Sequence, residues 1–282
     1  MKIQKNVFLS KHVTFKIGGL ARYFFIAKNK KDIINAIKFS QEKKLSYFIL
    51  GGGSNLLASD NGYDGIVIKI SNSKISFNNK IIKVDAGVKL MDLVDFSIKN
   101  NLSGLEWAIG IPGTVGGAVR GNAGAFGHSI SEVIEKVIVL RNNKDKKCND
   151  KDCEFSYRDS VFKHNSDIII SAELQLQRGY KKQSQKLIQD YLKQRKQKHP
   201  LEYASAGCVF KNPKPLSTAQ LIEDCGLKGK QIGGAKISEK HANFIVNLGD
   251  AKSDDVIKLI QFIKIKIKDK FSVELEEEIQ YL

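Results

Sequence analysis

The sequence feature that most constrains this chain is the glycine-rich stretch from Gly104 to Gly127, which holds eight glycines and one proline in 24 residues. Glycine loses much conformational entropy on folding and adds no side chain to a core. We therefore expect irregular backbone here, against which a ligand can lie, and no efficiently packed helix or strand. Thr114, Asn122 and the neighbouring main-chain amides are the expected hydrogen-bonding groups for an extended polar ligand.

A second glycine run, Gly51–Gly53, follows the apolar segment Tyr47–Leu50. Three glycines at the end of a strand let the backbone approach a ligand closely and turn its amides toward an anion. The run matches neither the G-x-x-x-x-G-K-[ST] loop of ATP-binding proteins nor the G-x-G-x-x-G dinucleotide fingerprint. Taken alone, it is equally compatible with a simple tight turn and with a diphosphate cradle.

Composition indicates a globular protein, with 42% hydrophobic and 27% charged residues over 282 positions. No apolar run reaches the roughly 18 residues of a membrane span, and the N-terminus lacks a signal-peptide pattern, so we expect a cytoplasmic protein. The four cysteines form no C-x-x-C pair and suit a reducing compartment, so neither a disulfide framework nor a metal site is expected. Cys148 and Cys153 are predicted to lie in a polar surface loop.

The formal net charge of +16 raises the alternative of a basic nucleotide- or nucleic-acid-binding protein without catalysis. The lysines, however, are spread from Lys2 to Lys270 and do not interleave with aromatic residues in a basic stripe. No nucleic-acid-binding motif is present either. We therefore expect no nucleic-acid partner, and a basic site for an anionic cofactor and substrate accounts for part of the charge.

Hydrophobic periodicity and turn residues predict an α+β chain without internal repeats. The expected elements before residue 200 are a helix over 33–45, strands at 47–50 and 65–70, a hairpin turning at Asn78-Asn79, a helix over 90–100, strands at 133–140 and 168–177, and a solvated helix over 181–199. This pattern predicts a first domain over residues 1–178 with lobes at about 1–70 and 71–178, and a connecting helix over 179–199.

The predicted C-terminal domain covers residues 200–282. Ser217 begins a capping-box pattern for a helix that Gly226 can close, and Ser253 is the expected N-cap of a second helix whose first turn carries acidic residues. Strands are expected at 243–247 and 273–281.

Several motifs together resemble a known family. GGGSNLL (51–57), GIPGTVGGAV (110–119) and NAGAFG (122–127) resemble the vanillyl-alcohol-oxidase type of FAD-binding fold. Motifs that resemble the shorter variant of the UDP-N-acetylenolpyruvoylglucosamine reductase family, also called UDP-N-acetylmuramate dehydrogenases, are TFKIGG (14–19), SYRDS (156–160), AGCVFKNP (206–213), GGAKISEKHANFIVN (233–247) and LEEEI (275–279). This resemblance covers nearly the entire chain.

The resemblance implies a two-lobed FAD-binding domain followed by an α/β substrate-binding domain. It implies NADPH-dependent reduction of UDP-N-acetylglucosamine enolpyruvate to UDP-N-acetylmuramate through bound FAD, in peptidoglycan precursor synthesis, by a monomer. The implied FAD contacts are Gly51, Gly52, Gly53, Ser54, Asn55, Leu56, Pro112, Gly113, Thr114, Gly116, Gly117, Asn122, Ala123 and Gly124. The implied substrate contacts are Tyr157, Asn212, Lys196 and Lys240.

By the same resemblance, the catalytic residues are Arg158, Cys208 and Glu278. A guanidinium at Arg158 suits the substrate carboxylate because it is planar and permanently charged. Cys208 stands where the family more often has serine as the proton donor, and a thiol is a stronger acid than a hydroxyl. Glu276 and Glu278 would share one face of a strand, so the register of the glutamate run decides between them.

One rival within the same fold is an oxidase of small alcohols or hydroxy acids, in which the flavin is often attached covalently through histidine. His12 and His128 are the only histidines near the flavin-like motifs, and neither lies in an attachment motif.

Overall fold

The computed structural model describes residues 2–282 and consists of two compact units. Unit 1 contains Phe25–Gly52 and Val67–Arg195, and unit 2 contains Ile3–Phe24, Gly53–Ile66 and Lys196–Leu282. The predicted domain limits at 178 and 200 remain predictions, because compact units defined by contacts need not coincide with domains. Among residues 2–282, no helix has the length and apolar character needed to cross a membrane.

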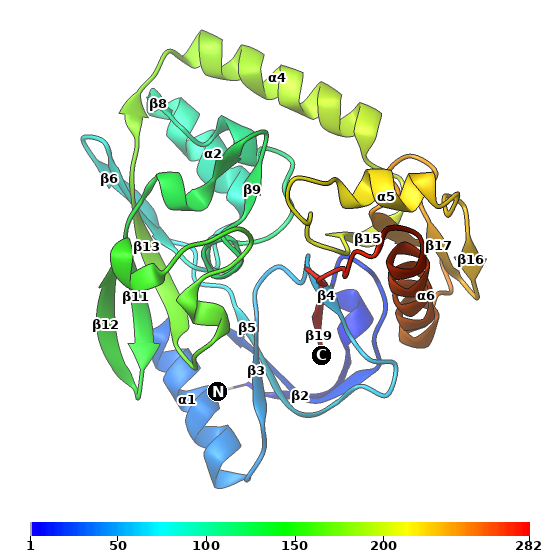
Figure 1. Cartoon of the computed structure of the whole chain (residues 1–282). Coiled ribbons are helices and arrows are strands. Elements are labelled where there is room, and N and C mark those ends of the chain that lie inside the picture. The colour runs from blue at the N-terminus through cyan, green and yellow to red at the C-terminus, as the bar shows by residue number, and fades with distance from the viewer. Residues whose placement is uncertain (1) are drawn as a thin grey trace. The chain divides into compact units, whose positions relative to one another are not determined.

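Unit 1 is built on a five-stranded antiparallel sheet (Figure 1). The order of the strands is β12 (Lys144–Asn149), β11 (Ile134–Arg141), β13 (Ile168–Gln175), β7 (Ile81–Asp85) and β6 (Ile75–Asn78). Val137, Val139, Ala172 and Leu174 are fully buried at alternate positions, as expected for a sheet with one face against a core. The predicted hairpin is present, with Asn79 at φ 56° in its turn.

Two helices accompany this sheet: α2 (Leu90–Lys99), and α3 (Val115–Arg120), which packs on β13 and β7. The helix α3 lies inside the glycine-rich stretch, so the prediction that this stretch contains no packed helix is wrong. Glycine is favoured here by close packing, because a Cβ added to Gly116 would lie 2.9 Å from the Ala86 Cβ. The Gly116 amide donates to the Ala86 carbonyl oxygen at 2.8 Å.

The helix α1 (Lys30–Glu42) has Asn29 as its N-cap. The Asn29 side chain accepts a hydrogen bond from the Asp32 amide, which has no partner within the helix. The helix is followed by β3 (Tyr47–Leu50). A four-stranded sheet has the order β1 (Gln4–Phe8), β2 (Leu20–Ala27), β5 (Tyr63–Ile70) and β3. The strands β2 and β5 each carry the chain from one unit into the other.

The predicted solvated helix is α4 (Lys181–Lys198), and its last turns contact the glycine-rich stretch. Tyr191 stacks on Phe126 with 4.1 Å between ring centroids, and the Arg195 guanidinium carbon lies 5.1 Å from the same ring. Arg195 is 7% exposed. Short strands of unit 1 are β8 (Leu102–Ser103) paired with β14 (Gln177–Arg178), and β9 (Gly124–Ala125) paired with β10 (His128–Ser129).

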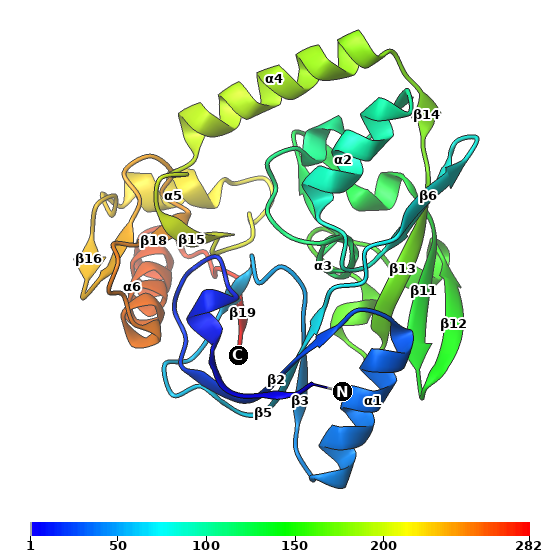
Figure 2. The same cartoon turned by 180° about the vertical axis from the view of Figure 1, so that it is seen from behind.

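Unit 2 contains a second antiparallel sheet with the long helix α6 (Ser253–Phe271) against β17 and β16 (Figure 2). The order of the strands is β15 (Ala204–Cys208), β18 (Phe244–Asn247), β17 (Ala235–Ile237) and β16 (Gln231–Ile232). The predicted apolar face of α6 is confirmed, since Val256, Ile260, Ile263 and Ile267 are all buried. A short parallel pair joins β4 (Leu56–Leu57) to β19 (Gln280–Tyr281).

The helix α5 (Thr218–Asp224) begins as predicted, with Ser217 as N-cap accepting from the Gln220 amide. The predicted N-cap at Ser253 is wrong: Lys252 is the N-cap of α6, and Ser253 is its first residue. The Ser253 hydroxyl donates to the Asp60 carboxylate at 2.9 Å. Single 3-10 turns lie at Leu9–Lys11, Glu106–Ala108, Ile130–Glu132, Lys151–Cys153 and Val161–Lys163.

Two further predictions are wrong. The segment 273–281 is not one strand: it makes an isolated bridge from Glu277 to Phe210 and then the two-residue strand β19. Cys148 and Cys153 are not in a surface loop, because Cys148 lies in β12 and both side chains are buried. Burial raises the pKa of the Cys153 thiol to about 12. The residues around these cysteines are mostly polar, so no hydrophobic pattern in the sequence identifies Cys148 and Cys153 as inward-facing positions.

Candidate active site

The two glycine segments of unit 1 lie against each other backbone to backbone. A Cβ added to Gly52 would lie 2.7 Å from the Gly113 Cα, and one added to Gly51 would lie 2.7 Å from the Thr114 hydroxyl oxygen. The contact of Gly52 is with backbone, so a side chain there would force the two segments apart, whereas the contact of Gly51 is with a side-chain hydroxyl. This close packing is compatible with both interpretations of the sequence, a tight turn and a diphosphate cradle, so the FAD contacts stay a prediction.

Thr114 and Pro112 frame the second of these segments. Thr114 is the N-cap of α3, and its side chain accepts from the Gly117 amide at 3.5 Å. The Gly113 carbonyl oxygen accepts from the Leu90 amide at 3.1 Å, so the Pro112-Gly113-Thr114 turn is fixed to the start of α2. This turn is therefore attached to the starts of α2 and α3.

The remainder of the first glycine run belongs to unit 2. Gly53 has φ 65°, and a Cβ there would lie 2.5 Å from the His12 carbonyl oxygen. The Thr14 amide donates to the Gly53 carbonyl oxygen at 3.0 Å. Ser54 is half-buried, and Leu56 is buried where β4 pairs with β19.

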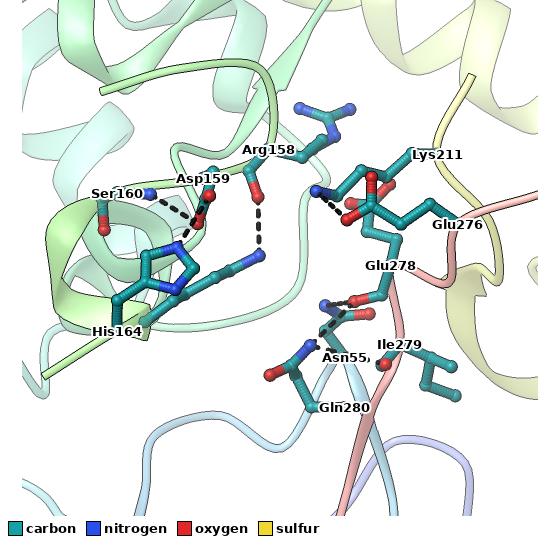
Figure 3. Close-up of polar contacts among 11 residues, drawn as sticks. Asn55, Arg158, Asp159, Ser160, His164, Lys211, Glu276, Glu278, Ile279 and Gln280 are labelled. Atoms are coloured by element: carbon teal, nitrogen blue, oxygen red, sulfur yellow. Dashed lines mark hydrogen bonds and ion pairs between the residues drawn. The ribbon is translucent and has the colours of Figure 1, made fainter. Parts of the chain in front are cut away.

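Asn55 links this loop to the C-terminal segment (Figure 3). Its side-chain amide donates to the Glu278 carbonyl oxygen at 2.9 Å, and its own carbonyl oxygen accepts from the Gln280 amide at 3.0 Å. The Gln280 side chain also donates to the Glu278 carbonyl oxygen, at 3.4 Å. The backbone of Glu278 is therefore fixed by the loop that carries the predicted flavin contacts Ser54, Asn55 and Leu56.

Cys208 and Glu278 lie on neighbouring segments of unit 2. Cys208 ends β15, after a bulge in which Gly207 has φ 81°. The next residue, Val209, accepts from the Glu278 amide at 2.8 Å. The buried Asn243 side chain both donates to and accepts from the Phe210 backbone, at 2.8 and 3.0 Å. These bonds set the direction of the chain on either side of Cys208.

The three consecutive glutamates have different surroundings. Glu276 is exposed and pairs with Lys211 at 2.6 Å. Glu277 pairs with Lys264 at 3.0 Å and accepts a short hydrogen bond from the Tyr281 hydroxyl. Glu278 is half-buried, and its backbone holds the bonds described above. Glu277 is half-buried as well and bridges Phe210, but its carboxylate is paired with Lys264 and Tyr281.

Arg158 lies at the tip of a tight turn in unit 1. The backbones of Ser156 and Asp159 bond to each other in both directions, at 3.1 and 3.2 Å, and Arg158 has φ 59°. Asn122 is buried and donates from its side chain to the Ser156 carbonyl oxygen at 2.8 Å. Asn122, which the sequence predicted to contact the ligand, thus supports the Arg158 turn.

The neighbours of Asn122 also shape this region. Ala123 accepts from the Ile130 amide at 2.9 Å. A Cβ added to Gly124 would lie 3.1 Å from an Arg158 guanidinium nitrogen, so the Arg158 side chain rests on the backbone of Gly124. Two of the predicted flavin contacts, Asn122 and Gly124, therefore contact the Arg158 region directly.

Known proteins match this chain over nearly its full length. A family model described as UDP-N-acetylenolpyruvoylglucosamine reductase, C-terminal domain, matches residues 199–282, and one described as FAD binding domain matches residues 21–142. Curated proteins named UDP-N-acetylenolpyruvoylglucosamine reductase are 42% identical in Caldanaerobacter subterraneus subsp. tengcongensis, covering 99% of this chain and 93% of that protein, and 39% identical in Prochlorococcus marinus, covering 99% and 98%. The chain belongs to the UDP-N-acetylenolpyruvoylglucosamine reductase family.

A solved structure of this reductase family, from Thermus caldophilus, matches with a TM-score of 0.86 at 32% identity, covering 100% of this chain and 99% of that one. This match confirms the predicted α+β fold and the family resemblance of the motifs. This member of the reductase family has cysteine at position 208, where the resemblance implies that serine is more common among family members.

The predicted substrate contacts of this reductase family member are more dispersed. Tyr157 is exposed, with the Arg158 guanidinium carbon 5.5 Å from its ring centroid. The Asn212 side chain accepts from the Thr218 amide at 3.0 Å, which fixes the start of α5. Lys240 lies 4.0 Å from the Glu202 carboxylate, and Lys196 is exposed on α4. Tyr157 lies in unit 1 and the other three in unit 2.

The sequence did not single out three residues that fix the backbone of this site. Lys163 and His164 follow the S-Y-R-D-S motif and contact the Arg158 turn, at 2.6 Å to the Arg158 carbonyl oxygen and 2.8 Å to the Asp159 carboxylate. Asn243 lay inside a recognised motif without an assigned role. The sequence shows only that these residues lie in or next to the motifs. Polar residues in loops have no periodicity from which their hydrogen bonds could be predicted.

Proposed function

We propose that this protein catalyses the NADPH-dependent reduction of UDP-N-acetylglucosamine enolpyruvate to UDP-N-acetylmuramate through bound FAD, a step in peptidoglycan precursor synthesis. The observation that carries the proposal is membership of the reductase family over the entire chain. The glycine-only backbone at Gly52 and Gly113 supports it, because backbone without side chains lets an anionic cofactor approach the main-chain amides closely.

Bound FAD would supply the redox chemistry, namely transfer of a hydride from NADPH to the terminal vinyl carbon of the substrate. The residues proposed to hold it are Gly51, Gly52, Gly53, Ser54, Asn55, Leu56, Pro112, Gly113, Thr114, Gly116, Gly117, Asn122, Ala123 and Gly124. For Gly52 and Gly53 the support is close backbone packing that no side chain would fit. For Asn122 and Gly124 the role includes support of the Arg158 turn.

Arg158 is proposed as the electrophilic residue. Addition of hydride to the terminal vinyl carbon puts negative charge on the adjacent carbon and its carboxylate. A guanidinium stabilises that charge with two parallel hydrogen bonds and does not deprotonate at neutral pH. The turn around Arg158 is held from several sides, which suits an electrostatic group that must not reorganise during the reaction.

Cys208 is proposed as the acid that completes the reduction. Its thiol proton goes to the carbon adjacent to the carboxylate, and the sulfur keeps the bonding electron pair as a thiolate. Solvent returns the proton before the next turnover. The position at the end of β15, fixed through Val209 and Phe210, supports a residue held toward a ligand on rigid backbone.

Glu278 is proposed to act beside Cys208, because its amide donates to the Val209 carbonyl oxygen on the neighbouring segment. We further propose that Tyr157, Asn212, Lys196 and Lys240 contact the nucleotide sugar, with the lysines near its diphosphate. We also propose that the protein is a cytoplasmic monomer. Its molecular mass, measured by sedimentation equilibrium, tests the monomeric state.

The test is an anaerobic absorbance trace of the purified protein with FAD. Addition of NADPH should bleach the flavin, and subsequent addition of UDP-N-acetylglucosamine enolpyruvate should restore the absorbance. Bleaching without recovery would reject this substrate, and the absence of a flavin signal after FAD addition would reject a flavoenzyme.

A further inference from the structure

We propose that Lys163 and His164 are positioning residues that hold the Arg158 turn in its reactive conformation from outside the S-Y-R-D-S motif. The inference rests on the proposed function, because it takes Arg158 as the group that meets the substrate carboxylate. It extends that function to two residues that the motif does not contain.

The Arg158 turn needs external support. Residues 156–159 form a four-residue turn closed by bonds between the backbones of Ser156 and Asp159. Arg158 has φ 59°, in the left-handed region, at a turn position where glycine or asparagine is preferred. A non-glycine residue persists there only when surrounding contacts determine its conformation.

Lys163 supplies the first such contact. Its ammonium group donates a charge-assisted hydrogen bond to the Arg158 carbonyl oxygen at 2.6 Å. This carbonyl group belongs to the peptide plane between Arg158 and Asp159. A bond that fixes the carbonyl oxygen therefore also fixes the direction of the chain into Asp159. Lys163 lies at the end of the 3-10 turn Val161–Lys163, whose Phe162 is buried, so the lysine starts from a fixed backbone position.

His164 supplies the second contact, on the residue after Arg158. Its Nε2 lies 2.8 Å from the Asp159 carboxylate, and the other oxygen of that carboxylate accepts from the Ser160 amide at 2.9 Å. Although burial acts in the opposite direction, these hydrogen bonds and the nearby Lys163 keep the pKa of Asp159 below its usual value. The Ser160 hydroxyl donates to the Arg120 carbonyl oxygen at 2.7 Å and anchors this side to α3.

The Arg158 side chain then has a defined support. It rests on the backbone of Gly124 and lies over the Tyr157 ring. A shift of the turn by a fraction of an ångström would move the guanidinium off this support. Lys163 and His164 therefore act on the reaction through Arg158, without contact to the substrate.

Stopped-flow absorbance of the FAD-loaded protein tests the inference in two separate half-reactions. In Lys163→Met and His164→Gln, flavin reoxidation by UDP-N-acetylglucosamine enolpyruvate should slow roughly ten- to a hundredfold, because small displacements of a catalytic group reduce rates this much. Flavin reduction by NADPH should change by less than about twofold, because Arg158 is assigned to the other step. Lys163→Arg keeps a cationic donor and should recover most of the rate.

Matched controls come from the same unit. His128 pairs with Glu132 at 2.8 Å, the same kind of exposed histidine–carboxylate pair outside the turn, and Lys151 is an exposed lysine of a 3-10 turn. His128→Gln and Lys151→Met should leave both half-reactions unchanged. Equal slowing of both half-reactions in Lys163→Met, no gain from Lys163→Arg, or the same loss in His128→Gln as in His164→Gln would overturn the proposal.

Amide hydrogen exchange tests the same contacts without the reaction. In Lys163→Met, the Ser156 and Asp159 amides, which close the turn, should exchange at least about tenfold faster, with no change in the five-stranded sheet. Unchanged exchange in the turn would overturn the supporting role of Lys163. If the wild-type flavin is not reoxidised by the substrate, the proposed function fails, while this measurement still decides whether Lys163 holds the turn.

Discussion

The Glu278 amide donates to the Val209 carbonyl oxygen at 2.8 Å, so the segments that carry Glu278 and Cys208 run side by side within unit 2. The side chain of Asn55 binds the other face of the same residue, at the Glu278 carbonyl oxygen. Two proposed catalytic residues and one proposed flavin contact are thereby joined by backbone hydrogen bonds. The role of each of these residues can be tested by its own substitution.

Replacing Cys208 should affect only one half-reaction. Cys208→Ala removes the proposed proton donor, so flavin reoxidation by substrate should slow by a factor of about 10²–10⁴, the usual contribution of general acid catalysis. Flavin reduction by NADPH should be spared. Cys208→Ser restores a proton donor and should recover part of the rate in the same stopped-flow trace. Equal slowing of both half-reactions in Cys208→Ala would count against the role as proton donor.

Glu276 and Glu278 provide a matched pair of variants. Glu278→Gln should lower the rate of flavin reoxidation by at least about tenfold, since it removes the carboxylate next to the Cys208 segment. Glu276→Gln removes the pair with Lys211, in which the Glu276 side chain is 70% exposed, and it should leave turnover unchanged because no catalytic role is proposed for Glu276. Steady-state turnover of both variants checks the register. The opposite pattern would assign the catalytic role to Glu276.

Gly52 should control the affinity for FAD. The Cβ in Gly52→Ala would lie 2.7 Å from the Gly113 Cα and force the two backbone segments apart. Such overpacking costs about 1–3 kcal/mol of folding stability. The displaced segments also carry proposed FAD contacts, so the dissociation constant for FAD should rise about tenfold or more, which corresponds to about 1.4 kcal/mol of binding free energy. Flavin fluorescence titration of the apoprotein measures it. Gly121→Ala, whose nearest contact would be an ordinary 3.5 Å, is the control and should bind FAD normally.

Regular elements could be predicted because their side chains follow a period. The helix 181–199 and the apolar face of Val256, Ile260, Ile263 and Ile267 correspond closely to α4 and α6. The failures occurred where tertiary contacts override local preference. The glycines of α3 are accommodated in a helix because Gly116 packs on Ala86, and Ser253 bonds to Asp60 instead of capping its helix.

The resemblance of the motifs predicts Arg158, Cys208 and Glu278 as catalytic residues, and this assignment stays a prediction. The contacts that support these residues could not be predicted. The contact from Lys163 to the Arg158 carbonyl oxygen and the bond from Asn55 to Glu278 depend on turns and on pairing between distant segments. No spacing in the sequence encodes such contacts.

The four cysteines should react with iodoacetamide at different rates. Cys148 and Cys153 are buried, and burial raises the pKa of both thiols, that of Cys153 to about 12, so the reactive thiolate is scarce. Cys208 and Cys225 are only half-buried. Mass spectrometry of the native protein at pH 8 should find label at Cys208 and Cys225 at least about tenfold sooner. Early labelling of Cys153 would show that the 3-10 turn Lys151–Cys153 opens readily.

Protonation of His241 should destabilise unit 2 in mild acid. Burial, with Lys228 and Lys198 nearby, lowers the pKa of His241, and its Nδ1 has no hydrogen-bond partner within residues 2–282. Because the folded-state pKa lies below the ordinary value of about 6.5, the unfolded chain binds more protons below that pH, and stability must fall as pH decreases through this range. The imidazole also packs on Phe244, with 4.9 Å between centroids.

Urea unfolding at pH 7.5 and 5.5 measures this effect. The wild type should lose more free energy of unfolding between the two pH values than His241→Gln, which keeps a polar side chain but cannot titrate. His128→Gln, at an exposed histidine of unit 1, serves as the control and should show the wild-type dependence. An equal loss in the wild type and His241→Gln would mean that other groups carry the acid sensitivity, since only the titration of His241 distinguishes these two proteins over this range.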